Sequence, residues 1–423
     1  MWVCMVTRSL DVDAYLWVRS ARELTKANAI LRTTFTRFDQ SRYQAYSGWL
    51  GVVLKRSSPR SFEDPDIVRL DGKTSRQQAL DRIWNQGFEF GRPFICYTIL
   101  QHTDGKLEMV IKMDHGLYDG SLLRIWQSHF SAFHSGQAIA KFTDFRDFAF
   151  WTQNMNKTKT KEFWRSQLAD SRVEVFAMPS KTYLPCAAQT IFMEGKTGND
   201  ILTAAASKAN VTVPILFQAA FQLWLANQCN PGRKSQENKS GLGPVVSFDY
   251  LYTGRNIDLP QPDTINGPCA TFVPLFIRLG KYTQPLSDYL SSTQSSFWEA
   301  TENASLSIRD IYSSADLDRQ SDGNKILFLY QPFEAPAPQE QLRSTIPFIT
   351  MAGSQVRMRQ PYAMVCQVKR TSSKHLVQFT FDENVLSRED IWKRLEDIWK
   401  IIGRLCDNLL EEKITIVQDL LGL

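Results

Sequence analysis

The stretch LEMVIKMDHGLYDGSLLRIW, residues 107–126, decides how this chain folds. Its first half alternates apolar and polar side chains, which is the pattern of a β-strand with one apolar face. From Ser121 the apolar residues recur at helical spacing, so a helix follows the strand directly. Continuing the strand period places His115 on the apolar, inward face and Asp114 on the polar face. The stretch therefore predicts an ionisable imidazole where a strand meets a helix.

Neighbouring segments predict the rest of the fold class. Residues 94–100, FICYTIL, form another apolar run, and the polar turn that follows contains Asp104-Gly105, a strong hairpin signal. Upstream, residues 11–29 carry apolar side chains on one helical stripe. Strands and helices alternate irregularly through both halves of the chain, which favours a mixed α/β (α+β) architecture.

Length and composition restrict the classes of protein. A chain of 423 residues exceeds what one hydrophobic core usually serves, and its periodicity is lost across residues 171–188. We therefore expect two lobes, 1–175 and 176–423. The net charge of +5 is too weak to indicate nucleic-acid binding, and no Cys/His spacing predicts a metal site. Seven scattered cysteines, with no signal peptide and no long apolar span, predict a cytoplasmic monomer that does not contact membranes.

His115 and the pair Asp119-Gly120 carry the candidate chemistry. An imidazole accepts a proton near neutral pH, and a carboxylate at a helix start accepts backbone hydrogen bonds or pairs with an arginine. Glycine lets the backbone turn sharply beside them. Taken alone, the spacing is more often that of a structural histidine followed by a helix N-cap. Cys269 has no base near it in the sequence, and we interpret it as a core residue.

The motif and its surroundings resemble the condensation domains of nonribosomal peptide synthetases, particularly the fungal ones. The motif of that family is His-His-x-x-x-Asp-Gly, and Asp114 stands here in place of the first histidine. Further segments that resemble family blocks follow in the family's order, at 29–35, 142–168, 252–279, 305–312 and 379–391. The resemblance therefore extends over most of the chain. A further helix-forming block that usually precedes the first strand is missing, so the chain looks N-terminally shortened.

The resemblance implies an architecture and an activity. It implies two chloramphenicol-acetyltransferase-like lobes arranged as a V, with the active-site tunnel between them. The implied enzyme is an acyltransferase of secondary-metabolite biosynthesis, which forms an amide, an ester or a macrocycle from carrier-bound thioesters. It would bind no cofactor of its own, because the substrates arrive on the phosphopantetheine arms of carrier proteins. A free-standing chain without a carrier motif would act on these peptidyl or acyl carriers in trans.

The resemblance also assigns roles to individual residues. His115 would position or deprotonate the nucleophile, or stabilise the tetrahedral state. Asp119 would hold the loop by pairing with either Arg32 or Arg255, and Gly120 would keep the site open. The residues expected on the substrate-binding side are Asp114, Tyr118, Arg32 and Arg255.

Two alternative functions share the same motif. A coenzyme-A-dependent acyltransferase of the same superfamily would use free acyl thioesters. Such enzymes usually carry a second motif, Asp-Phe-Gly-Trp-Gly, and nothing between residues 320 and 400 resembles it. A catalytically inactive remnant would bind carrier proteins without turnover.

Overall fold

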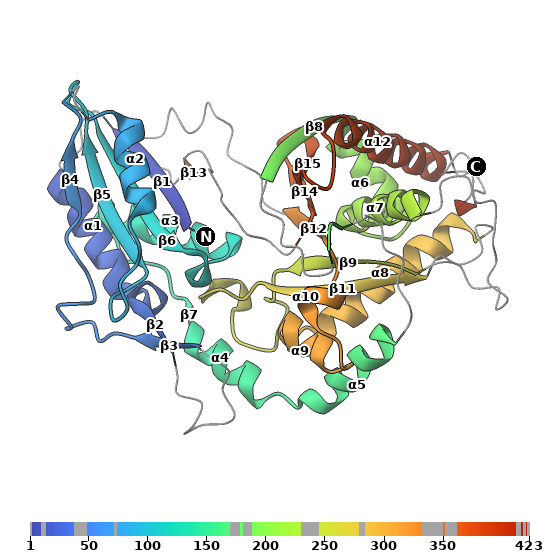
Figure 1. Ribbon diagram of the computed structural model, residues 1–423, viewed down its shortest axis with the longest axis horizontal. Coiled ribbons are helices and arrows are strands. Elements are labelled where there is room, and N and C mark those ends of the chain that lie inside the picture. The colour runs from blue at the N-terminus through green and yellow to red at the C-terminus, as the bar shows by residue number, and fades with distance from the viewer. Residues whose placement is uncertain are drawn as a thin grey trace. The chain divides into compact units, whose positions relative to one another are not determined.

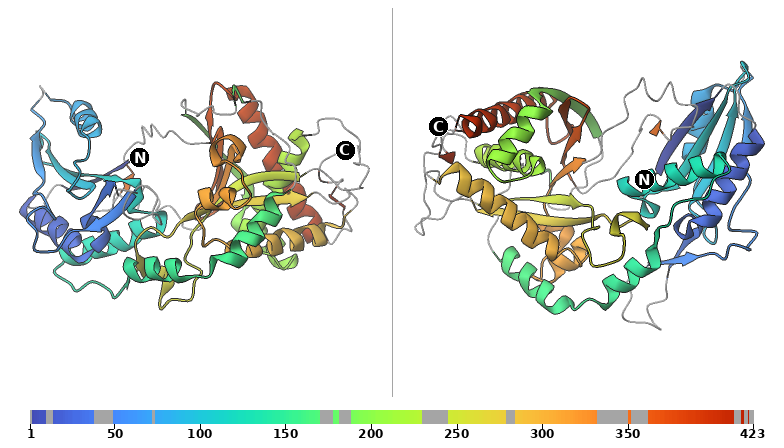
Figure 2. Two further views of the ribbon diagram at one scale, coloured as in Figure 1. Left: turned by 60° about the horizontal axis from the view of Figure 1, so that its bottom comes forward. Right: turned by 180° about the vertical axis from the view of Figure 1, so that it is seen from behind.

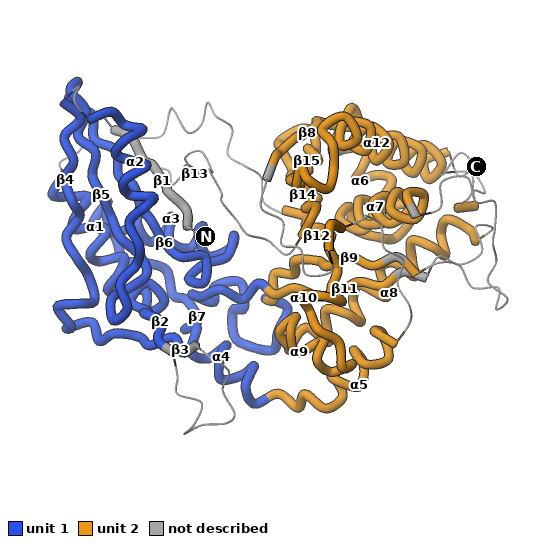
Figure 3. Tube along the Cα trace, in the orientation of Figure 1, with its two compact units in different colours: residues 1–154, 255–270, 338–356 blue, residues 155–254, 271–337, 357–423 orange. Residues whose placement is uncertain are grey.

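The computed structural model of the chain (Figure 1) divides into two compact units, coloured separately in Figure 3. Unit 1 comprises Met1–Asn154, Arg255–Ala270 and Pro338–Val356, and unit 2 comprises Met155–Gly254, Thr271–Ala337 and Arg357–Leu423. The residues described are 2–9, 14–37, 49–71, 74–169, 178–180, 188–229, 245–278, 284–331, 350–351, 362–411, 416–417 and 420. Each unit has its own sheet and its own hydrophobic core.

These units differ from the expected lobes in three places. Residues 338–356 join unit 1. Helix α5 (Lys157–Leu168) belongs to unit 2, where the indole N–H of Trp164 donates to the carbonyl oxygen of Asn303 at 2.8 Å. Residues 255–270 instead join unit 1, although the chain on both sides of them belongs to unit 2. Contacts with residues far away in the sequence determine the unit to which α5 and residues 255–270 belong. The expected boundary at 171–188 lies largely outside the described residues.

Unit 1 is built on a five-stranded sheet with the strand order β13-β1-β6-β5-β4. Its elements are β1 (Trp2–Ser9), α1 (Ala14–Ala27), η1 (Ala29–Arg32), β2 (Thr33–Arg37), β3 (Trp49–Val53), β4 (Asp66–Arg69), α2 (Arg76–Asn85), β5 (Ile95–Gln101), β6 (Leu107–Asp114), η2 (His115–Leu117), α3 (Gly120–His134), β7 (Thr143–Asp144), α4 (Phe145–Asn154), η3 (Pro262–Thr264), β10 (Ile265–Asn266) and β13 (Thr350–Met351). Strands β5 and β6 pair antiparallel, which confirms the predicted hairpin. Gly105 in their turn has φ +81°, a backbone conformation that favours glycine.

One face of this sheet forms the main core of unit 1. Alternate residues of β6 lie in it, as the sequence predicts: Leu107, Met109, Ile111 and Met113. Trp17 of α1 and Trp126 of α3 are both buried against the same face. Full burial of an apolar side chain of this size stabilises the folded state by about 1.5–3 kcal/mol. Strand β6 is therefore held firmly up to the residue that precedes the motif histidine.

The opposite face of β6 is polar, yet it is buried beneath α2. The Glu108 side chain is 1% exposed and accepts hydrogen bonds from Arg76 Nη2 at 2.7 Å and from the His102 Nε2–H at 2.9 Å. Lys112 on the same face is buried too, and its ammonium lies 4.7 Å from the centre of the Phe88 ring. A buried carboxylate requires such partners, because desolvation destabilises its charged form.

The stability of unit 1 should fall as the Glu108 carboxylate is protonated. Burial alone raises the pKa of Glu108, but the hydrogen bonds from Arg76 and His102 outweigh it, and the pKa is lowered overall. The stabilisation is therefore complete above the ordinary glutamate pKa and is lost as the pH falls through the lowered value. We expect Glu108→Gln to cost about 2 kcal/mol at neutral pH and less in acid. Urea unfolding at several pH values measures this, and a loss that does not shrink in acid would contradict the assignment.

Unit 2 is built on a six-stranded sheet with the strand order β11-β9-β12-β14-β15-β8. Its elements are α5 (Lys157–Leu168), β8 (Ala188–Gly198), α6 (Asn199–Lys208), α7 (Val213–Cys229), β9 (Val245–Tyr252), β11 (Thr271–Arg278), α8 (Leu286–Glu302), α9 (Ile308–Ser313), α10 (Arg319–Asp322), β12 (Ile326–Gln331), β14 (Met364–Arg370), β15 (Lys374–Asp382) and α12 (Arg388–Leu410). Helices α6, α7, α8 and α12 cover one face of this sheet (Figure 2).

Helix α7 is the centre of that core, since residues 215–226 are all buried. No single described helix is long and apolar enough to cross a membrane. Helices α6 and α7 together meet the length and composition of a span, but an 87° bend separates them.

Candidate active site

The candidate site is the loop that joins β6 to α3. Strand β6 ends at Asp114, whose carboxylate accepts a hydrogen bond from the Gly116 backbone N–H at 2.8 Å and thereby caps the short helix η2. Tyr118 then returns to an extended backbone, and Asp119 caps α3 by accepting from the Leu122 backbone N–H at 2.8 Å. Two carboxylates of adjacent turns therefore fix the backbone on either side of the histidine.

His115 is exposed at this loop, and its orientation is determined by Tyr118. Its Nδ1 lies 3.2 Å from the Tyr118 carbonyl oxygen, and the two rings stack with their centres 4.3 Å apart. Because a carbonyl oxygen only accepts, Nδ1 carries the proton in this contact. In the neutral ring, Nε2 then presents its lone pair, and it has no hydrogen-bond partner among the described residues. This arrangement suits a general base.

The prediction that His115 lies on the inward face was wrong. The period of two holds only to the end of β6, and His115 begins η2, where the backbone turns. The ring therefore points away from the core, while Asp114 is half-buried. Tyr118 takes the buried position instead: its side chain is 4% exposed, and burial raises its pKa. No described group hydrogen-bonds the Tyr118 hydroxyl.

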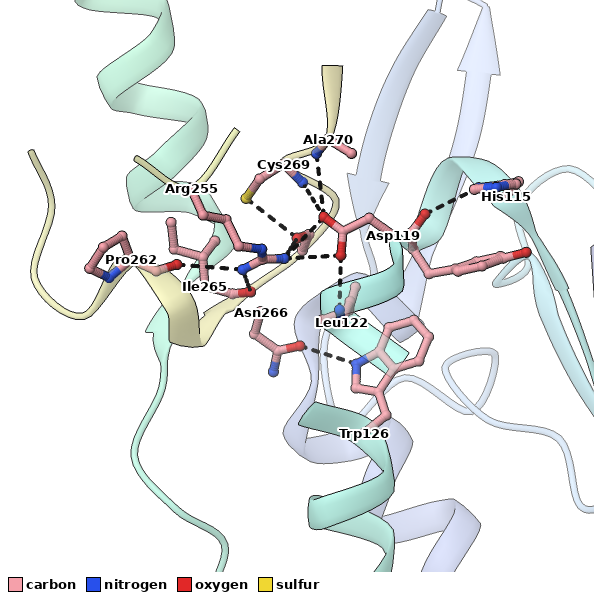
Figure 4. A network of polar contacts seen from close by, with 12 residues as sticks. His115, Asp119, Leu122, Trp126, Arg255, Pro262, Ile265, Asn266, Cys269 and Ala270 are labelled. Carbon is pink, nitrogen blue, oxygen red and sulfur yellow. Dashed lines mark hydrogen bonds and ion pairs between the residues drawn. The ribbon is translucent and has the colours of Figure 1, made fainter. Parts of the chain in front are cut away.

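Asp119 forms a buried ion pair with Arg255 within unit 1. Its two carboxylate oxygens lie 3.1 and 3.0 Å from Arg255 Nη2, and the two side chains are 7% and 4% exposed. The backbone N–H groups of Cys269 and Ala270 donate to the same carboxylate at 2.8 and 3.3 Å (Figure 4). Every one of these donors except Leu122 N comes from residues 255–270. Such charge-assisted bonds are strong, so the segment and the loop are held as one structure.

Of the two candidate arginines, the structure pairs Arg255 with Asp119. Arg32 ends η1, is 6% exposed, and donates through Nη1 to the Leu54 carbonyl oxygen. Burial, with Arg56 nearby, lowers the pKa of Arg32. Arg32 therefore stabilises the chain around β2 and β3 and does not pair with the motif aspartate.

Gly120, the first residue of α3, is exposed, and Gly116 has two close neighbours. A Cβ at Gly116 would lie 3.1 Å from the Asp114 carboxylate and 3.5 Å from the Phe35 ring. Sequence reasoning assigned no role to Gly116 or to the backbone amides of Cys269 and Ala270. Backbone donors carry no residue-type signal, so only the fold identifies them.

Cys269 should be chemically inert in the folded protein. Its side chain is 3% exposed, its thiol lies 3.5 Å from the Gly267 carbonyl oxygen, and burial is the main factor that raises its pKa to about 12. Because the thiolate is the reactive form, we expect negligible alkylation of Cys269 by iodoacetamide at pH 8. Peptide mass spectrometry measures the labelling, with the denatured protein as control. Native labelling as fast as in the denatured chain would contradict the assignment.

The described side chains offer no metal centre, since no three His, Cys, Asp or Glu among them gather in one place. Cys96, Cys269, Cys366 and Cys406 carry free thiols.

The fold and the site define a mixed α/β protein with a histidine on a strand-to-helix loop that a buried Asp-Arg pair holds. The model of the condensation domain family matches residues 3–418. Nonribosomal peptide synthetase sidE of Aspergillus fumigatus is 38% identical over 415 residues, which are 96% of this chain and 18% of the relative. Nonribosomal peptide synthetase 7 of the same organism is 32% identical over 98% of this chain and 16% of its own length.

Solved structures agree on the fold. The condensation domain from monacolin K polyketide synthase MokA gives a TM-score of 0.72 at 13% identity, over 97% of this chain and 92% of that one. The structure of holo T3CT gives 0.72 at 16% identity, over 96% and 87%. The expected mixed α/β, chloramphenicol-acetyltransferase-like fold is thereby confirmed.

This chain belongs to the condensation domain family. Membership implies the role of an amide-bond-forming acyltransferase, and condensation domains work with carrier domains in nonribosomal peptide synthetases. The chain spans less than a fifth of the length of the two synthetases to which it is compared, at 18% and 16%.

Proposed function

We propose that this chain catalyses the condensation of carrier-bound thioesters and that His115 is its catalytic residue. A nucleophilic amine on one substrate attacks the thioester carbonyl of the other. The new C–N bond forms, the C–S bond breaks, and the amine proton passes to the departing thiolate. A hydroxyl nucleophile would give an ester, and a nucleophile within the same substrate a macrocycle. The observation that carries the proposal is the exposed His115 ring with its Nε2 lone pair directed away from the core.

His115 would accept the proton of the nucleophile as the new bond forms, or orient the nucleophile for attack. Its Nδ1–H contact with the Tyr118 carbonyl fixes the tautomer that such a base requires. Asp119 acts through the loop and not on substrate, because its side chain is 7% exposed and its oxygens already accept from Arg255 and from backbone amides. It is a positioning residue.

Of the four residues expected on the substrate-binding side, two lie next to His115 and two have structural contacts of their own. Asp114 and Tyr118 flank His115 directly, so a substrate that contacts the imidazole also lies near them. Arg32 and Arg255 are buried and use their guanidinium groups on protein oxygens, which favours structural roles for both.

Much of the rate would come from holding two tethered substrates together. Carrier domains present both thioesters on phosphopantetheine arms, and confinement of two reactants replaces a bimolecular encounter. We propose that the carriers belong to a synthetase and that this chain, as a monomer with no resident cofactor, uses them in trans. The products would belong to nonribosomal peptide or related secondary-metabolite biosynthesis.

The test supplies two kinds of acyl donor to the purified chain. One reaction contains aminoacyl thioesters loaded on fungal synthetase carrier domains, and the other contains the same acyl groups on coenzyme A. We expect product, detected by mass spectrometry, only from the carrier-bound donors. Turnover of acyl-coenzyme A alone would identify a coenzyme-A-dependent acyltransferase instead. Carrier binding without turnover, in a pathway whose product does not depend on His115, would identify an inactive remnant.

A further inference from the structure

Residues 255–270 cross into unit 1 and are anchored there at more than one point. Strand β10 (Ile265–Asn266) pairs in parallel with β7, with Asn266 opposite Asp144. Arg255 begins the segment and binds Asp119, while Cys269 and Ala270 end it and donate to the same carboxylate. The middle of the segment has an anchor of its own, which lies deeper in the core.

That anchor is a chain of hydrogen bonds among four buried side chains. Trp126 Nε1 donates to Asn266 Oδ1 at 3.1 Å, Asn266 Nδ2 donates to Asn28 Oδ1, and His129 Nδ1 lies 3.0 Å from the same Asn28 oxygen. All four side chains are 2% exposed or less. Figure 4 shows the indole of Trp126 directed at the Asn266 amide. We call the four residues, Asn28, Trp126, His129 and Asn266, the amide clamp.

The contacts of the amide clamp determine which of its atoms donate and which accept hydrogen bonds. An indole N–H can only donate, so the Asn266 oxygen must face Trp126 and its NH₂ group must face Asn28. The Asn28 NH₂ group donates to the Leu24 carbonyl, which leaves its oxygen as the acceptor for both neighbours. His129 therefore carries its proton on Nδ1, and burial lowers the pKa of this imidazole, which favours the neutral ring. No alternative orientation of either amide satisfies the same partners.

The amide clamp lies next to the contacts that hold the motif aspartate. Arg255 Nη1 donates to the Ile265 carbonyl oxygen at 2.8 Å, and Nη2 donates to the Gly267 carbonyl oxygen at 3.0 Å. These two carbonyls belong to the residues immediately before and after Asn266. A displacement of Asn266 would therefore move two of the carbonyl acceptors that orient the Arg255 guanidinium, which is the partner of Asp119.

The amide clamp and the motif also share one helix. Asp119 caps α3, and Trp126 and His129 lie farther along the same helix. Residues 255–270 are thus fixed to α3 at two levels, by the ion pair at its start and by Asn266 near its middle. Two separated attachments prevent rotation of the segment about either one.

We propose that Asn266 is a positioning residue of the condensation site. The amide clamp holds the Arg255 guanidinium and the backbone amides of residues 269 and 270 at hydrogen-bond distance from the Asp119 carboxylate. The consequence for catalysis rests on the proposed function, whereas the structural consequence does not. Asn266→Ala removes both hydrogen bonds that the Asn266 side chain makes, with Trp126 and with Asn28. Trp126→Phe is the milder variant, because it removes one hydrogen bond of the clamp, that of the indole N–H, and keeps a smaller aromatic ring in the core.

Hydrogen exchange of the full chain tests the structural consequence directly. In Asn266→Ala and in Trp126→Phe, the Cys269 and Ala270 amides should exchange about tenfold faster or more, because their acceptor Asp119 is no longer held in register. The matched control is Asn324→Ala in unit 2, which removes a buried asparagine that donates to Asp249 at 2.8 Å. It should leave exchange at 269 and 270 unchanged. Unchanged exchange in both clamp variants would overturn the proposal.

Steady-state kinetics on carrier-bound donors tests the catalytic consequence. We expect Asn266→Ala to lower kcat by about tenfold to a hundredfold with KM within about twofold, since a small misplacement of catalytic groups costs that much. In an Asp119→Asn background the same change should add little further loss, because the clamp acts through Asp119. An equal loss of kcat in the parent and in the Asp119→Asn background would show that the amide clamp does not act through Asp119. If the parent chain is inactive on all donors, the proposed function fails, and the exchange result still decides the clamp.

Discussion

Replacement of His115 by alanine should lower kcat on carrier-bound thioesters by about 10²- to 10⁴-fold, the contribution typical of a general base. The substitution removes the Nε2 lone pair, which is the proposed acceptor of the nucleophile's proton. The fold should be retained. The His115 side chain is exposed, and its contacts with the described residues are the Nδ1 bond to the Tyr118 carbonyl and the stack on the Tyr118 ring. We therefore expect the free energy of unfolding to change by no more than about 0.5 kcal/mol.

The matched control is His134→Ala. His134 lies at the end of α3 in the same unit, is half-buried, and takes no part in the loop. Its loss should leave kcat close to that of the parent chain. Product formation is followed by mass spectrometry and stability by urea unfolding of both variants. If His115→Ala formed product as fast as the parent, the imidazole would not be the catalytic group, and carrier binding without turnover would become the better description.

The strand pattern around the motif could be predicted from local sequence, because it depends on local physics. The apolar alternation in β6 identified the face that packs on α1 and α3, and Asp104-Gly105 identified the turn before it. The same reasoning failed at His115. Alternation indicates direction only while a strand continues, and the Asp114 carboxylate ends this strand by capping η2. The direction of the imidazole therefore follows from the turn at Asp114 and from the contacts with Tyr118.

Other features of the site depend on contacts that local patterns do not encode. Arg32 and Arg255 are the same residue type, so the motif alone does not tell which of them pairs with Asp119. The pairing depends on the fold, which brings Arg255 next to Asp119 although the two are 136 residues apart in the sequence. The amide clamp is similarly distributed, since Asn28 and Asn266 are 238 residues apart. Glu108 lies on the polar face of β6, where α2 buries it against Arg76. Pairing across such distances follows from topology rather than from spacing.

Asp119→Ala should give the largest loss of stability of any single change at the site. The carboxylate accepts from the Arg255 guanidinium and from the backbone amides of Leu122, Cys269 and Ala270, all in a buried setting. Its removal leaves a buried cation and buried amide groups without their acceptor. Breaking a buried ion pair in this way costs about 3–5 kcal/mol. Because whole domains are stable by only about 5–15 kcal/mol, the variant should unfold at markedly lower urea concentration and lose product formation.

A double-mutant cycle separates the pair from its surroundings. Arg255→Ala alone should also be strongly destabilising, because it leaves the Asp119 charge buried beside the amides. The double variant Asp119→Ala/Arg255→Ala has no uncompensated charge, so its loss should be smaller than the sum of the single losses by about 1–3 kcal/mol. Arg255→Lys should recover little, since an ammonium cannot bind the carboxylate and the carbonyls of Ile265 and Gly267 with the geometry of a guanidinium. Additive losses would show that the two side chains act independently, and the ion pair could not then be what holds the His115 loop to residues 255–270.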